Sequence, residues 1–131
     1  MGAGPETEPL LRGLIAVGAL LAALAVVLGA FGAHGLEQRL SERALTTWHT
    51  AVQYHFIHAL ALLLLAALWS HLASAWALAT AVALVVGVLL FSGSLYALAL
   101  GAPRVLGAVA PLGGTAFILG WIGLAIAASR A

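Results

Sequence analysis

Long apolar runs alternate with short polar segments along this chain. The first run covers residues 13–33 without interruption. At about 1.5 Å per residue, a helix of that length reaches roughly 31 Å, which is enough to cross the hydrocarbon core of a bilayer. Three more apolar runs cover about residues 51–68, 76–100 and 105–128. The pattern therefore predicts an all-α membrane protein with four transmembrane helices.

The segments between these runs are short, and this sets the expected topology. Short connections favour an antiparallel, up-down-up-down bundle with both termini on one side of the membrane. We expect residues 1–12 to form a polar N-terminal tail, residues 13–128 a single four-helix transmembrane domain, and residues 129–131 a C-terminal tail. Pro111 lies near the start of the fourth run, where a proline marks either a kink or the first turn of the helix.

Residues 35–50 form the charged connection between the first two runs. They carry Glu37, Arg39, Glu42 and Arg43, together with apolar residues at four-residue spacing, namely Leu36, Leu40, Ala44 and Trp48. This pattern is typical of a short amphipathic helix that lies at the membrane interface, with its tryptophan at the level of the headgroups. Ser41 is the expected cap of its second half, which leads directly into the next transmembrane helix.

Composition supports the membrane location. Hydrophobic residues make up 64% of the chain and charged residues 7%, with a mean hydropathy of +1.15, whereas soluble domains are about half apolar and a quarter charged. The formal net charge is only +1 and the sequence holds no basic cluster, which argues against nucleic-acid binding. Because the chain has no cysteine, disulfides, thiolate ligands and cysteine nucleophiles are excluded.

Polar residues of the four runs fall at one end of the predicted bundle. Antiparallel threading brings them into one leaflet, and the candidate polar cluster consists of His34, Gln53, Tyr54, His58, Ser92, Ser94, Tyr96 and Thr115. A histidine at membrane depth costs free energy unless it finds a partner, so we expect His58 to bond to groups such as Tyr54, Ser94 or Tyr96. His55 shares a helix face with His58 at three-residue spacing.

Small residues and a proline lie beside this cluster. We expect them to allow close helix packing or local bending, since small side chains let helix backbones approach in lipid; they are Gly93, Pro111, Gly113, Gly114 and Gly120. Gly93, Gly113 and Gly114 lie in two segments, residues 91–94 and residues 111–114. Neither segment follows a predicted strand or precedes a P-loop lysine, so neither is expected to bind a phosphate group.

Four strings in the sequence resemble those of a known family. They are FGAHGL at 31–36, YHFIHALALL at 54–63, LFSGSLYALAL at 90–100 and PLGGTAFILGW at 111–121. They are similar to strings of domain-of-unknown-function family 423, small four-span membrane proteins that include transmembrane protein 256 of animals. The resemblance covers about residues 13–125 and implies the four-helix membrane fold. It places His58 on a motif position that His55 does not clearly match, and it implies no activity.

The residues available for chemistry limit the function classes. Metal or bis-histidine haem binding would rest on His34, His55 and His58, but no Asp, Glu or Cys lies within the apolar runs to complete a ligand set. A Ser-His-Asp arrangement fails for the same reason. We therefore expect no catalytic residue, no metal site and no cofactor.

Three functional interpretations remain. The first is a non-enzymatic accessory, assembly or interaction module, in which the polar cluster fixes the register of the helices. The second is a small transporter or channel for protons or a small polar solute, and the third is a haem-binding or metal-binding membrane subunit. The expected partners are the lipid bilayer and either a second copy of the chain or a larger membrane complex. We expect a multi-pass protein of the bacterial cytoplasmic membrane.

Overall fold

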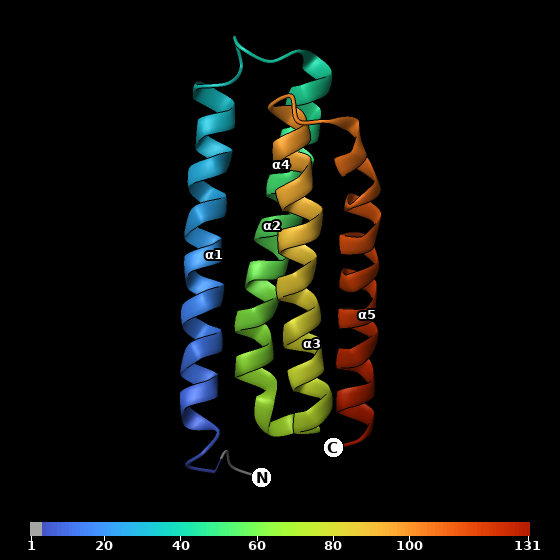
Figure 1. The fold of residues 1–131 in the computed structure, drawn as a ribbon. Coiled ribbons are helices and arrows are strands. Elements are labelled where there is room, and N and C mark those ends of the chain that lie inside the picture. The colour runs from blue at the N-terminus through green and yellow to red at the C-terminus, as the bar shows by residue number, and fades with distance from the viewer. Residues whose placement is uncertain (1–3) are drawn as a thin grey trace.

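Four long helical segments stand side by side in the computed structural model, which describes residues 4–131 (Figure 1). Their elements are, in chain order, α1 (Glu8–His34), α2 (Glu42–Leu68) with the short turn η1 (Trp69–His71), α3 (Ser74–Gly87) continued by the π-helical turn η2 (Val88–Ser92) and α4 (Gly93–Ala99), and η3 (Arg104–Ala108) with α5 (Ala110–Ser129). Each segment is long and apolar enough to cross a membrane, and residues 4–131 contain no strand. The four predicted spans are thus present as helices.

Both ends of the chain lie at the same end of the molecule (Figure 1). The connections over residues 35–41 and 100–103 lie at the other end, which we call the loop end. The turn over residues 69–73 lies on the side of the termini. Residues far apart in the sequence are therefore brought to the same height along the helices.

The connection between α1 and α2 differs from the expected one. Residues 42–50 form the first turns of α2 and not a separate interfacial helix, while residues 36–40 form a turn. Ser41 explains where α2 starts, because its Oγ accepts a hydrogen bond from the Ala44 backbone N–H at 3.1 Å. From there to Leu68 no proline or glycine interrupts the chain, so the helix continues into the apolar run.

Two helices begin with a proline in their first turn. α1 starts at Glu8, earlier than the hydropathy pattern indicated, with Pro9 directly after it. α5 starts at Ala110, and Pro111 follows. Proline is tolerated at this position because the first N–H groups of a helix have no acceptor within it. Of the two interpretations of Pro111, the helix start is the one observed.

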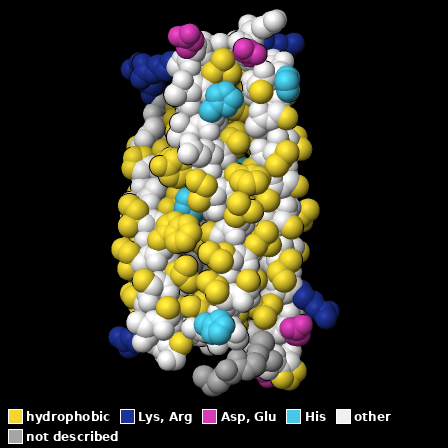
Figure 2. All heavy atoms as spheres, turned by 180° about the vertical axis from the view of Figure 1, so that it is seen from behind, with side chains coloured by type: hydrophobic (Ala, Val, Ile, Leu, Met, Phe, Trp, Pro, Cys, Tyr) yellow, Lys and Arg dark blue, Asp and Glu magenta, His cyan; other side chains and the backbone are white. Residues whose placement is uncertain are grey.

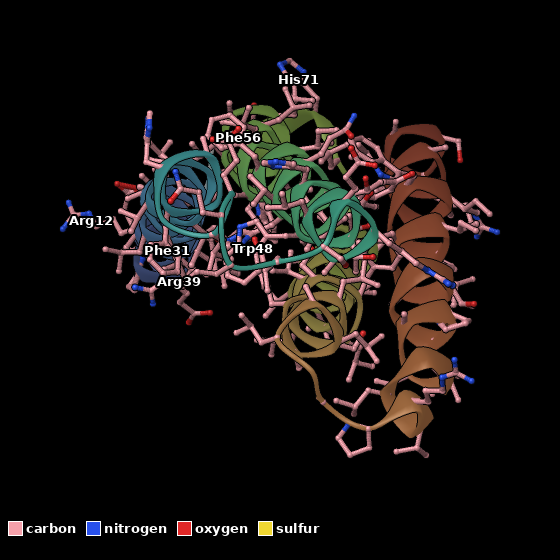
Figure 3. All side chains as sticks on the ribbon, turned by 90° about the horizontal axis from the view of Figure 1, so that it is seen from above. Arg12, Phe31, Arg39, Trp48, Phe56 and His71 are labelled. Carbon is pink, nitrogen blue, oxygen red and sulfur yellow. The ribbon has the colours of Figure 1, made fainter. Side chains whose placement is uncertain are left out.

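The segments form two closely packed pairs. α1 packs almost entirely on α2, and α5 packs on α3 and η2, so that α1 and α5 lie on opposite sides of the molecule (Figure 3). Glycines lie where backbones approach: a Cβ on Gly18 of α1 would be 3.1 Å from the Ala59 carbonyl oxygen, and one on Gly123 of α5 would be 2.7 Å from Thr80 Oγ1. We call α1 with α2 the first pair, and α3, η2 and α4 with α5 the second pair.

α2 joins the two pairs, because it packs against α3, η2 and α4. The larger hydrophobic core includes Leu62 and Leu65 of α2, Leu84 of α3 and Phe117 of α5, while a smaller core at the loop end surrounds Trp48. On the face seen in Figure 2, charged side chains lie towards the two ends and apolar side chains cover most of the surface between them. That distribution is the one expected for helices that face lipid acyl chains.

Candidate functional site

Three side-chain hydrogen bonds cross from α2 to the second pair. The bonded atoms are Ser92 Oγ with the Ala51 carbonyl oxygen (2.8 Å), the Tyr96 hydroxyl with His55 Nδ1 (2.8 Å), and Trp121 Nε1 with His58 Nε2 (3.0 Å). Their partners come from η2, α4 and α5, one from each. Within the part of the chain that the structure describes, no other side-chain hydrogen bond joins the pairs. We call these three contacts the interpair bonds.

The helical repeat explains why α2 supplies one member of every interpair bond. Ala51, His55 and His58 follow one another at spacings of four and three residues, so they share one face of the helix. Their exposed fractions are 0%, 2% and 4%. The polar atoms on this face are therefore shielded from lipid by the helices packed against it.

His58 uses both nitrogens of its ring. Nδ1 lies 2.7 Å from the Tyr54 carbonyl oxygen, and since a carbonyl oxygen only accepts, Nδ1 carries the proton. Nε2 then accepts the hydrogen bond from the Trp121 indole. The ring also stacks on Phe117, with centroids 3.5 Å apart. In this arrangement the imidazole is neutral and has no lone pair left for a metal ion.

Tyr96 extends the network towards α1. Its ring packs against Trp48 with centroids 4.7 Å apart, and Trp48 Nε1 donates to the Leu28 carbonyl oxygen of α1 at 2.9 Å. Phe31 of α1 packs edge-on against the same tryptophan, with ring centroids 6.3 Å apart (Figure 3). Trp48 is thus the contact through which α1, α2 and α4 meet near the loop end.

His55 has one ring nitrogen that is buried without a partner. Nε2 makes no hydrogen bond of ordinary geometry within the described residues, although the Leu21 backbone of α1 lies beside the ring. Nδ1 is occupied by Tyr96. Buried polar atoms are hydrogen-bonded in the large majority of cases, so this nitrogen is the one unsatisfied polar atom on the α2 face.

Not all of the predicted cluster joins this network. His34 and Gln53 are exposed, and no side-chain hydrogen bond of theirs is found within residues 4–131. Ser94 and Thr115 donate to carbonyl oxygens one helical turn earlier, at 3.0 and 2.8 Å. Tyr54 is 40% exposed and contributes its ring and its backbone. Of the eight predicted residues, the structure brings His58, Ser92 and Tyr96 into the interpair bonds.

His55 and Trp121 were not among the residues of the predicted polar cluster. Both supply side-chain atoms to the interpair bonds. A usable signal for His55 was its spacing from Ala51 and His58, which places it on the same face. For Trp121 the signal was chemical, because an indole N–H at membrane depth needs an acceptor.

The predicted packing and bending residues have different surroundings. A Cβ on Gly113 would meet the Phe91 backbone, and one on Gly120 would lie 2.9 Å from Leu84 Cδ2. A Cβ on Gly114 would make ordinary contact with the Phe91 ring at 3.8 Å. Nothing lies within 4 Å of the corresponding point on Gly93, which begins α4 directly after the π-helical turn.

A pocket opens between α2 and α5 beside His58, with a volume of about 550 Å³. Its walls include the aromatic rings of Tyr54, Phe91, Phe117 and Trp121, and its polar lining comes from Gln53, His58 and Thr115. No charged side chain lines it. We call it the α2–α5 pocket. The Trp121 to His58 bond fixes two of its lining side chains.

Comparison with known proteins identifies the family. A family model described as "Protein of unknown function (DUF423)" matches residues 28–114. The chain belongs to this family. The UPF0382 membrane protein YwdK of Bacillus subtilis is 50% identical over 117 residues, which cover 88% of this chain and 95% of the relative. A UPF0382 membrane protein of Haemophilus influenzae is 44% identical over 100 residues, covering 76% of this chain and 80% of the relative.

The names of these relatives agree with a membrane location. They are named membrane proteins and come from bacteria, and the four apolar helices make this chain a multi-pass integral membrane protein. No solved structure matches the chain. The matched family segment contains His55, His58, Ser92 and Tyr96, whereas Trp121 lies beyond it.

Proposed function

We propose that the protein is a non-enzymatic interaction module whose four spans cross the membrane alternately. The observation that carries this proposal is the set of interpair bonds, which use the polar atoms of Ser92, His58 and Tyr96 to join the two helix pairs. Polar groups committed to helix contacts fix the register and separation of the pairs. They are not available to activate water or a substrate.

The composition of the spans also supports a non-catalytic role. No acidic residue lies between positions 9 and 36 or after position 42. General acid or base work by His58 would require breaking its bond to Tyr54 or to Trp121. Ser92 Oγ donates its proton to the Ala51 backbone carbonyl, and within the described residues it makes no hydrogen bond with a histidine that would activate it.

The α2–α5 pocket is the proposed site of interaction, and its ligand is an uncharged amphiphile of the bilayer. Its volume of about 550 Å³ falls in the range of small-ligand pockets. Its walls are aromatic and carry no charge, while Gln53 and Thr115 offer hydrogen bonds. The pocket follows α5 only from Pro111 to Trp121, roughly 15 Å of helix, which is about half the hydrocarbon thickness. A spanning partner helix would need a longer groove.

Photolabelling with a matched pair of variants tests this proposal. A photoactivatable monoacylglycerol added to the reconstituted protein should label peptides of α2 and α5. Gly114→Leu should strongly reduce this labelling, because Gly114 lines the pocket and the leucine side chain would project into the space that the ligand occupies. Gly93→Leu is the matched control, since Gly93 has open space around it and lies outside the pocket. Labelling spread evenly over all four spans and unaffected by Gly114→Leu would refute the site.

A transporter is the second candidate, and one observation favours it. The π-helical turn η2 interrupts the third span beside α2, and His55 Nε2 is buried without a partner at about the same depth; π-helical turns occur frequently at functional sites. The half of the bundle near the termini is nearly all Ala, Leu and Val, which argues against a continuous polar path. Proton or solute flux into reconstituted vesicles above that of empty liposomes would favour this candidate over the module.

A further inference from the structure

A second cavity lies at the loop end, on the side of α2 that faces α4. Its volume is about 410 Å³. It is lined by the first turns of α2, by the end of α4 and by the connection that follows. The polar lining consists of Ser41, Arg43, Thr47 and Arg104, and the apolar lining includes Leu95 and Leu98. None of these residues belongs to the interpair bonds or to the α2–α5 pocket.

The cavity carries positive charge that no carboxylate neutralises. Two arginines line it and no acidic residue does. In the part of the chain that the structure describes, the only ion pair between side chains joins Arg12 to Glu8 at the far end of the molecule. Arg43 and Arg104 therefore both have their guanidinium groups available. A guanidinium donates parallel N–H bonds that match the oxygens of a phosphate group.

Two further features favour an anion at this place. Ser41 Oγ accepts from the Ala44 N–H, which leaves the serine hydroxyl proton free to donate. α2 begins at the cavity, and the N-terminal end of a helix carries partial positive charge. The Ser41 hydroxyl and the N-terminal end of α2 strengthen the attraction of the two arginines for an anion, but the arginines are what define the site.

The apolar lining indicates what is attached to the anion. Leu95 and Leu98 lie on α4, where they are partly exposed and give the cavity an apolar wall beside its charged end. An apolar wall does not stabilise a free inorganic anion, whereas it can pack against the acyl chains of a lipid. We infer that this cavity binds the phosphate group of an anionic phospholipid, with the acyl chains running along Leu95 and Leu98. The ligand differs in charge and in place from the uncharged amphiphile proposed above.

Lipid retention measured by native mass spectrometry tests the inference. The full-length protein in detergent is mixed with equal amounts of phosphatidylglycerol and phosphatidylcholine, and the lipids that stay bound are counted. The wild type should retain one phosphatidylglycerol in preference to phosphatidylcholine. Because each arginine near a membrane surface contributes appreciably to the attraction of anionic lipid, Arg43→Gln/Arg104→Gln should reduce the preference on the order of tenfold or more.

A matched pair of single substitutions separates a site from general surface charge. Arg104→Gln should weaken the retention, and because Arg104 is exposed at the start of a short turn, the variant should fold normally. Arg39→Gln removes the same charge at the same end, but Arg39 does not line the cavity, so retention should be unchanged. An equal loss in both variants would overturn the inference. So would equal retention of the two lipids by the wild type, or displacement of the lipid by millimolar inorganic phosphate.

Discussion

The tandem glycines at the start of α5 test how closely this helix packs on η2. A Cβ on Gly113 would collide with the backbone of Phe91. A Cβ on the adjacent Gly114 would lie 3.8 Å from the Phe91 ring, which is an ordinary contact. Gly113→Ala and Gly114→Ala are therefore the same chemical change one residue apart, with opposite steric consequences.

The expected magnitude follows from two effects. Replacing glycine by alanine within a helix favours the folded state by about 1 kcal/mol, and this gain is shared by both variants. Overpacking costs about 1–3 kcal/mol, and at Gly113 the obstacle is backbone, which cannot rotate aside as a side chain would. We therefore expect Gly113→Ala to have a free energy of unfolding about 2–3 kcal/mol lower than that of Gly114→Ala.

Unfolding by SDS in mixed micelles, followed by far-ultraviolet circular dichroism, measures this difference. Comparing the two variants with each other cancels the helix-propensity gain and isolates the steric term. The wild type serves as the reference for both, and Gly114→Ala should be at least as stable as the wild type. Stabilities of the two variants within about 0.5 kcal/mol of each other, the range of ordinary surface changes, would refute the close approach of α5 to η2.

Three further changes test individual contacts in the same assay. Ser92→Ala removes one interpair bond and should lower the free energy of unfolding by about 0.6–1.7 kcal/mol. Tyr96→Phe should lower it by about 1–3 kcal/mol, because it leaves His55 buried with no side-chain partner. Gly123→Ala should destabilise, since its Cβ would lie 2.7 Å from Thr80 Oγ1, and adding Thr80→Ala should restore most of the loss. An unchanged free energy of unfolding in Ser92→Ala or Tyr96→Phe would contradict the corresponding hydrogen bond. A failure of Thr80→Ala to restore the stability of Gly123→Ala would contradict the contact between α3 and α5.

The hydropathy pattern was sufficient to locate the spans, because lipid requires long apolar helices whose backbone groups are satisfied internally. Helix ends depended on local chemistry that hydropathy does not report. Ser41 caps α2 and makes residues 42–50 part of it, which an amphipathic pattern over the same residues did not distinguish from a separate helix. The first-turn position of Pro9 likewise extends α1 to Glu8.

The end of the bundle where polar groups meet was also predictable, but their pairing was not. His58 was expected to bond to groups such as Tyr54, Ser94 or Tyr96. Tyr54 is a partner through its backbone carbonyl, but the second partner is Trp121, which was not among them. The rotation of each helix decides which residues meet, and this rotation is set by glycine contacts and by the π-helical turn η2. A hydrophobic pattern that is apolar on all sides of a helix carries little information about rotation.

The interpair bonds should hold the two helix pairs together, and the distance between the pairs tests this directly. The chain has no cysteine, so spin labels can be attached to pairs of introduced cysteines at exposed positions. Val27→Cys on α1 with Leu119→Cys on α5 reports the distance between the pairs, and Val27→Cys with Leu60→Cys on α2 reports the distance within the first pair. All three positions are well exposed, at 61%, 59% and 44%.

The decisive measurement is the distance distribution between these labels, by double electron–electron resonance, with and without Ser92→Ala/Tyr96→Phe/His58→Phe. This triple substitution removes the side-chain hydrogen bond of every interpair contact. We expect the distance distribution between the pairs to broaden and shift, while the distribution within the first pair stays narrow. An unchanged distribution between the pairs in the triple variant would contradict the claim.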